Sequence, residues 1–166
     1  GMVDATGGEV DPTDTTASEN FREPGVYNGS EPNHYDVYVE AQQFLFVPGT
    51  NEPIRVPANS TVTFHVTSPD VIHGFEVVGT NINTMAVPGQ VATVTAEFDE
   101  PDEYGLVCNE YCGSAHHTME GKLQVVPPAE FDATDDATSS ANATSSANMT
   151  SGGNTTSTAT ATTEVN

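Results

Sequence analysis

Four side chains with soft donor atoms lie close together in one stretch of this chain. Cys108, Cys112, His116 and Met119 follow one another at intervals of four, four and three residues. Thiolate, imidazole and thioether form the ligand set that selects copper over harder ions. A mononuclear blue-copper site takes two histidines, one cysteine and a weak axial methionine, so this stretch has one cysteine too many for that site. A second metal, bridged by both thiolates, would use it.

Other structures are compatible with the same residues. The two cysteines are the only ones in the chain, and an extracytoplasmic cysteine pair commonly forms a disulfide. A Cys2His2 zinc site has the same ligand types, but the second half with its H-x3–5-H spacing is absent. An iron–sulfur cluster lacks its cysteines, and c-type haem attachment lacks its Cys-x-x-Cys-His. The spacing also fits one face of an amphipathic helix.

The sequence predicts that short strands position these residues. Glycines at 105, 113 and 121 punctuate the stretch and β-rich runs flank it, so we interpret it as a loop between two strands. Alternating apolar and polar residues, bounded by Gly/Pro turns, predict an all-β sandwich or barrel. The expected strands cover 35–40, 44–47, 54–57, 61–67, 74–78, 90–98, 103–108 and 122–126.

Two motifs carry a resemblance to a known family. The pattern Cys-x-Glu-x-Cys-Gly-x-x-His-x-x-Met, with the upstream run Asp-Val-Ile-His-Gly-Phe at 70–75, resembles the binuclear copper (CuA) domain of cytochrome c oxidase subunit II. The run 68–83 is most similar to the B-family haem–copper oxidases. The likeness covers roughly residues 32–127. It implies a cupredoxin-like Greek-key β-barrel.

The resemblance also implies a ligand set for two copper ions. In the family pattern both cysteines bridge the coppers. His73 and Met119 complete one copper, and His116 and the backbone carbonyl of Glu110 complete the other. In some relatives the side chain at the position of Glu110 binds magnesium at the boundary with subunit I. The full list of expected metal ligands is His73, Cys108, Glu110, Cys112, His116 and Met119.

The expected function is electron transfer. By resemblance, the domain accepts electrons from a cytochrome c or a small blue-copper protein and passes them to the haem-bearing subunit I of the oxidase. The domain itself carries no catalytic residue. One alternative is the copper-entry domain of nitrous-oxide reductase, although the context of His73 favours the oxidase. An alternative of a different class is a structural, disulfide-bonded β-domain.

The remaining candidate side chains have structural interpretations. His117 neighbours His116, but only His116 keeps the family spacing. The chain has no tryptophan, whereas many relatives receive electrons through a Trp-bearing patch. We expect solvation or satisfied hydrogen bonds at His34 and His65, and packing at Phe44, Phe46, Phe75 and Met85.

The charge of the chain excludes some functions. The net charge is −21, from 24 acidic residues against three basic ones. A nucleic-acid binder needs a basic face, and anionic lipid attracts basic segments, so both partners are excluded. Residues 31–128 carry thirteen acidic and two basic residues, a net charge of −11. Such self-repulsion is typical of proteins from salt-loving organisms.

Composition divides the chain into three parts. We expect residues 1–30 to be a disordered acidic linker, 31–128 to be the copper domain, and 129–166 to be a disordered tail rich in Ser, Thr and Asn. No apolar run is long enough to span a bilayer. The first two residues resemble a cloning scar, so we expect a soluble fragment of a protein anchored upstream, on the extracytoplasmic face. Asn-x-Ser/Thr sequons occur at Asn28, Asn59, Asn142, Asn148 and Asn154.

Overall fold

A computed structural model describes residues 7–132 of this chain, and the predicted tail from residue 133 onward lies outside the described residues. The described part is built of strands and three short 3-10 helices, which confirms the expected all-β class. The elements are η1 (Thr15–Ala17), β1 (Gly25–Asn28), β2 (His34–Gln42), β3 (Leu45–Val47), β4 (Ile54–Pro57), β5 (Ser60–Thr67), β6 (His73–Val77), β7 (Asn83–Ala86), β8 (Ala92–Phe98), β9 (Asp102–Val107), η2 (His116–Thr118), β10 (Glu120–Val126) and η3 (Pro128–Glu130).

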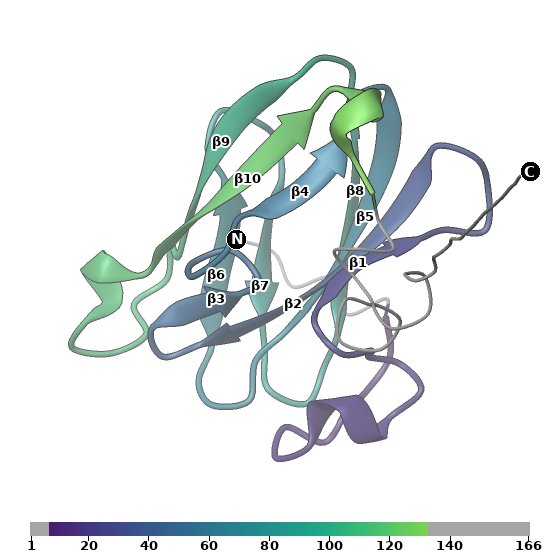
Figure 1. Ribbon diagram of the computed structural model, residues 1–166. Coiled ribbons are helices and arrows are strands. Elements are labelled where there is room, and N and C mark those ends of the chain that lie inside the picture. Colours follow the sequence, from purple (N-terminus) through teal and green to yellow (C-terminus); the bar gives the residue numbers. More distant parts are fainter. Residues whose placement is uncertain (1–6, 133–166) are drawn as a thin grey trace, which may run out of the picture.

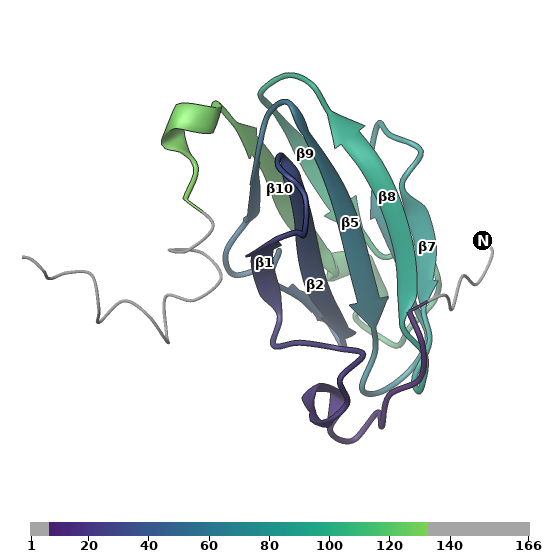
Figure 2. The same ribbon diagram turned by 90° about the vertical axis from the view of Figure 1, so that its right-hand side faces the viewer.

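The strands form two five-stranded sheets packed face to face (Figure 1). The first has the order β1-β2-β5-β8, with β3 paired to β2, and these strands lie side by side in Figure 2. The second has the order β4-β10-β9-β6-β7. Strands β2 and β5 pair in parallel, as do β4 and β10, while the other pairs are antiparallel. The chain therefore crosses repeatedly between the two sheets, as in a Greek-key barrel.

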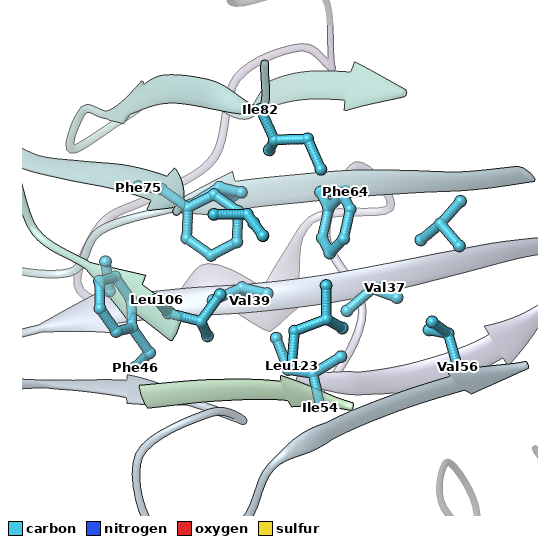
Figure 3. Packing of buried hydrophobic residues seen from close by; sticks show 14 of the residues in the cluster. Val37, Val39, Phe46, Ile54, Val56, Phe64, Phe75, Ile82, Leu106 and Leu123 are labelled. Atoms are coloured by element: carbon cyan, nitrogen blue, oxygen red, sulfur yellow. The ribbon is translucent and has the colours of Figure 1, made fainter. Parts of the chain in front are cut away.

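The core lies between the sheets and follows from the alternation of the sequence. In β2, Val37, Val39 and Ala41 are fully buried, while the residues between them are partly exposed. Strand β5 repeats this pattern with its own apolar residues. Figure 3 shows side chains from both sheets meeting in one layer. Because every second side chain of a strand points to the same face, this alternation directs the apolar set inward.

The expectation of disorder over residues 1–30 is wrong for the part that the structure describes. Residues 7–24, here called the N-terminal segment, pack on the outer face of the first sheet, and β1 extends that sheet. Phe21 is only 1% exposed and forms a second apolar cluster with Val10 and Val91, against which Tyr38 packs. Backbone hydrogen bonds join Gly7 and Val91. The apolar residues that order this segment are too few to show a period in the sequence.

The stretch that carries the soft ligands is a loop between β9 and β10, as predicted, and its only regular element is the three-residue η2. The amphipathic-helix interpretation is therefore wrong. Two strands were not predicted. These are β1 and β7, and β7 includes Met85. Among the described residues, no helix is long and apolar enough to cross a membrane.

Candidate metal centre

Three segments meet at one end of the barrel. The loop between β9 and β10 supplies Cys108, Cys112, His116 and Met119, and the start of β6 supplies His73. The turn between β2 and β3 lies beside them, as Figure 1 shows. Strand ends of a rigid barrel hold such loops in place, so the ligand positions depend on the packing of both sheets.

The two thiols occupy the centre of this group. Cys108 Sγ lies 3.5 Å from Cys112 Sγ, far longer than a disulfide bond of about 2.05 Å, and both cysteines are free. The disulfide expected as an alternative is thus not formed. Both side chains are buried, at 7% and 4% exposure. Two buried thiols this close can reach the same metal ions.

The other expected ligands surround the thiols. The Cys108 thiol donates to the carbonyl oxygen of Glu110 at 3.0 Å, and His73 Nδ1 lies 4.0 Å from the same sulfur. Cys112 Sγ lies 3.4 Å from His116 Nδ1 and 3.8 Å from Met119 Sδ. The structure therefore brings together all six positions predicted from the motif, although they come from two separate parts of the chain.

The Cys112 thiol is protonated in the metal-free protein. Burial, followed by the hydrogen bond and charge of Cys108, raises the pKa of Cys112 to about 12. The thiol must lose this proton to become a thiolate ligand, so metal binding is coupled to proton release. A soft metal ion would replace the proton as the partner of the sulfur.

A hydrogen bond orients His73, which is fully buried. Its Nε2 lies 2.7 Å from Asp70 Oδ1. Burial raises the pKa of Asp70, but hydrogen bonds from the Gln43 backbone N–H, from His73 and from the Val71 N–H outweigh it and hold that pKa below its usual value. This hydrogen bond holds the ring through Nε2, so that Nδ1 is the ring nitrogen that faces Cys108 Sγ.

Asp70 opens the run Asp-Val-Ile-His-Gly-Phe at 70–75, but the expected ligand set does not include it. The i, i+3 spacing of an acid and a candidate histidine ligand was the signal that could have identified it, since such histidines commonly donate to a carboxylate.

A close contact fixes the start of the ligand loop against β6. A Cβ added at Gly74 would lie 1.7 Å from Asn109 Oδ1 and 2.8 Å from the Asn109 backbone nitrogen. The Asn109 amide donates to Asn83 Oδ1 at 2.9 Å and to Glu76 Oε1 at 3.3 Å. Glycine at position 74 is needed because Asn109, which follows Cys108, packs directly on the backbone beside His73.

The residues expected to be outside the site lie outside it. His117 is exposed, and only His116 points its Nδ1 at a thiol. His65 stacks on Tyr38 and lies 2.9 Å from Asp36, and His34 lies 3.2 Å from the hydroxyl of Thr63. Phe46 and Phe75 are buried in the core, Phe44 packs partly against it, and Met85 is half-buried in β7.

The donor set fits copper on the evidence of this structure. Two thiols, two imidazoles, a thioether and a backbone carbonyl converge at one end of the barrel, and soft sulfur ligands with imidazole favour copper. His73, Cys108 and Cys112 alone place their ligand atoms within 4.8 Å of one another. Fold and site together define a cupredoxin-like copper-binding domain.

Comparison with known proteins gives the particular family. Residues 34–126 match the family described as cytochrome c oxidase subunit II, periplasmic domain. Subunit 2 of cytochrome c oxidase from Thermus thermophilus is 45% identical over 119 residues, which is 70% of this chain and 84% of that protein. This chain therefore belongs to the cytochrome c oxidase subunit II family. A periplasmic domain lies outside the cytoplasm, which agrees with the expected extracytoplasmic location.

Solved structures agree with this assignment. A chain of a haem–copper terminal oxidase dimer superposes with a TM-score of 0.58 at 37% identity, covering 64% of this chain and 73% of that one. The periplasmic domain of subunit II of cytochrome oxidase from Bradyrhizobium japonicum has a TM-score of 0.54 at 21% identity, covering 58% and 86%. The second likeness shows the shared fold alone. The family match describes an oxidase subunit, not nitrous-oxide reductase.

Proposed function

We propose that this domain receives single electrons at a binuclear copper centre and passes them to the haem-bearing subunit of a haem–copper oxidase. The observation that carries the proposal is the pair of free, buried thiols 3.5 Å apart, surrounded by His73, His116 and Met119. Cys108 and Cys112 would hold the metal through their thiolates, and copper bound there would supply one-electron redox chemistry. The part of the protein is to hold the ligands still and to keep the site dry.

Each ligand has a role in this proposal. Cys108 and Cys112 would be shared by both metals. His73 and Met119 would serve one copper, while His116 and the carbonyl of Glu110 would serve the other. The hydrogen bond from His73 to Asp70 fixes the ring, and the burial of Met119, which is 1% exposed, excludes water from its side of the site. Outer contacts of this kind tune the potential of a metal site.

Family membership supports a proposal about the partners. We infer that the domain docks on the catalytic subunit of the oxidase and that a membrane anchor holds it there. The external donor is a cytochrome c or a small blue-copper protein, and the oxidase is of the B family. We propose the side chain of Glu110 as a magnesium ligand at the boundary with the catalytic subunit. The acidity of the chain supports an origin in a salt-loving organism.

Metal analysis tests the proposal directly. The reduced protein is loaded with copper, freed of excess metal and analysed for copper and zinc per chain, together with its absorption and electron paramagnetic resonance spectra. We expect two coppers per chain and the spectrum of one electron shared over both. One copper per chain, or zinc in preference to copper, would contradict the binuclear centre.

A further inference from the structure

The turn between β2 and β3 contacts both parts of the chain that carry the metal ligands. The backbone N–H of Gln43 donates to Asp70 Oδ2 at 2.9 Å, and Asp70 in turn holds His73. The side-chain amide of the same residue donates from Nε2 to the carbonyl oxygen of Cys112 at 2.6 Å. One residue is therefore bonded to the orienting partner of one ligand and to the backbone of another.

The turn also packs tightly on the ligand loop. Gly113, directly after Cys112, has a φ of +141°, which side-chain-bearing residues rarely adopt. A Cβ there would lie 2.8 Å from Gln43 Nε2 and 2.8 Å from Phe44 Cζ. The loop thus approaches the turn as closely as a glycine permits, and the carbonyl of Cys112 meets the Gln43 amide at this point.

The contact between Gln43 and the ligand segments lies between the two sheets of the barrel. The turn belongs to the first sheet, whereas β6 and the loop between β9 and β10 belong to the second. The hydrogen bonds of Gln43 therefore join the two sheets at the metal end of the barrel. Movement of one sheet relative to the other would otherwise change the distance between Cys112 and the segment that carries His73.

We propose that Gln43 is a positioning residue of the copper centre, which holds the Cys112 backbone and the Asp70–His73 pair at a fixed separation. This inference rests on the proposed function, because its effect is exerted on the same ligands. Gln43 touches no reacting group. Its side chain is exposed and outside the apolar core, so its replacement leaves the packing of the barrel intact.

Two variants isolate the side-chain hydrogen bond. Gln43→Leu keeps the backbone N–H that donates to Asp70 but removes the donor to Cys112. Gln43→Glu keeps the shape and places an acceptor opposite the carbonyl. The matched control is Gln42→Leu, because Gln42 is adjacent in the chain but bonds Glu40, at 2.7 Å, and neither ligand segment.

We expect the wild type and all three variants to load the same amount of copper. Release of copper to a chelator should be about tenfold faster in Gln43→Leu, and faster still in Gln43→Glu. This is the typical effect of losing a hydrogen bond that orients a metal ligand. The reduction potential should shift in both Gln43 variants, whereas Gln42→Leu should match the wild type in release rate and potential.

A measurement on the metal-free protein separates positioning from metal loading. The His116 amide donates to the Gly113 carbonyl at 3.1 Å, and its hydrogen exchange should quicken in Gln43→Leu but not in Gln42→Leu. Wild-type release, potential and exchange in both Gln43 variants would overturn the inference, as would equal changes in Gln42→Leu. Failure of the wild type to bind two coppers would refute the binuclear centre instead, while leaving the exchange measurement interpretable.

Discussion

At the scale of single residues, the two sulfur types at the site differ in position. The thiols lie at the centre of the ligand group, 3.5 Å apart, whereas Met119 Sδ contacts only one of them, at 3.8 Å. Thiolates are the strong ligands of such a centre, and a methionine thioether is a weak axial ligand that mainly tunes potential. Replacing a cysteine should therefore alter the copper centre itself, whereas replacing Met119 should mainly change its potential.

We expect Cys108→Ser or Cys112→Ser to abolish the mixed-valence spectrum, because a hydroxyl cannot replace a bridging thiolate. Met119→Leu should retain copper and change the potential, since leucine fills the buried space of Met119. Copper titration followed by electron paramagnetic resonance distinguishes the two classes. Loss of all copper in Met119→Leu, with a native spectrum in Cys112→Ser, would reverse our assignment of roles.

The contact between Gly74 and Asn109 gives a second prediction at this scale. Gly74→Ala places a Cβ 1.7 Å from Asn109 Oδ1, so the ligand loop must move away from β6. We expect Gly74→Ala to lose copper affinity by about tenfold or more, because Cys108 and His73 are the chain neighbours of this contact. Chelator competition measures the affinity.

Gly105→Ala is the matched control for this substitution. Gly105 lies in β9, and an added Cβ there meets nothing within 4 Å. Its copper affinity should equal that of the wild type. Equal effects at both glycines would show that the loss arises from the strands and not from the loop contact.

At the scale of elements, the N-terminal segment stabilises the outer face of the first sheet. Phe21 packs edge-on against Tyr38 with ring centroids 5.4 Å apart, and Thr15 donates to Glu40 Oε2 at 2.6 Å. The aromatic ring of Tyr38 is stacked in turn on His65. These contacts lie outside the barrel core, so they stabilise the fold without touching the metal ligands.

Phe21→Ala should therefore lower the free energy of unfolding by about 3 kcal/mol, the typical cost of removing a buried phenylalanine. Urea unfolding of the metal-free protein measures this change, and Val78→Ala, at a side chain that is 46% exposed, serves as the control. The copper spectrum of Phe21→Ala at low temperature should be native. A free-energy change equal to that of the control would show that the segment does not contribute to stability.

The elements that the sequence predicted are those with a clear alternation. Strands β2 and β5 could be recognised because their apolar residues recur at every second position over eight or nine residues. By contrast, β1 and β7 have four residues each and include asparagine, which has low β-propensity. They are strands because neighbouring strands pair with them, which is a non-local cause.

The site also has parts that the sequence predicts and parts that depend on non-local packing. Residue type and spacing group Cys108, Cys112, His116 and Met119 as candidate ligands, whereas His73 and Glu110 are implied only by the resemblance to a known family. The role of Gln43 could not be predicted, because its two hydrogen bonds join residues 27 and 69 positions away in the sequence. Likewise, the close approach of Asn109 to Gly74 depends on the packing of the loop on β6.

At the scale of the whole molecule, we expect charge repulsion to lower stability. The net charge of −21 includes four acids within five residues at the turn between β8 and β9, namely Asp99, Glu100, Asp102 and Glu103, all exposed. Repulsion among such groups destabilises the compact state, and salt screens it. The melting temperature should rise from dilute buffer to molar sodium chloride, by about 4 °C for each kcal/mol gained.

Replacing these four acids with Asn and Gln tests whether their charge repulsion causes the rise of the melting temperature with salt. The variant should be more stable than the wild type in dilute buffer and should gain less from salt. A melting temperature that stays flat or falls with salt in the wild type would contradict the role of charge repulsion. An equal salt response in both proteins would assign the effect to other acidic residues or to apolar burial.

The acidity of the domain leads to a prediction about the proposed electron donor. Steering by opposite charge speeds association at low salt, but the Debye length in molar salt is about 3 Å. We expect a donor that works in molar salt to dock by apolar contact. The metal end of the barrel carries exposed apolar side chains, with Val71 at 37%, Ile72 at 43% and Tyr111 at 78% exposure. The Tyr111 ring lies 5.8 Å from that of the half-buried His116.

We therefore expect electron transfer from the native donor to be no slower as salt rises to molar levels, because apolar docking beside His116 is not screened. Stopped-flow reduction of the copper-loaded protein at several salt concentrations measures the rate. Tyr111→Ser should slow it at every salt concentration, while Val78→Ser, at the opposite end of β6, should not. A steep fall in rate with salt would show that the donor is basic and is steered by charge, and an unchanged rate in Tyr111→Ser would place the docking surface elsewhere on the acidic domain.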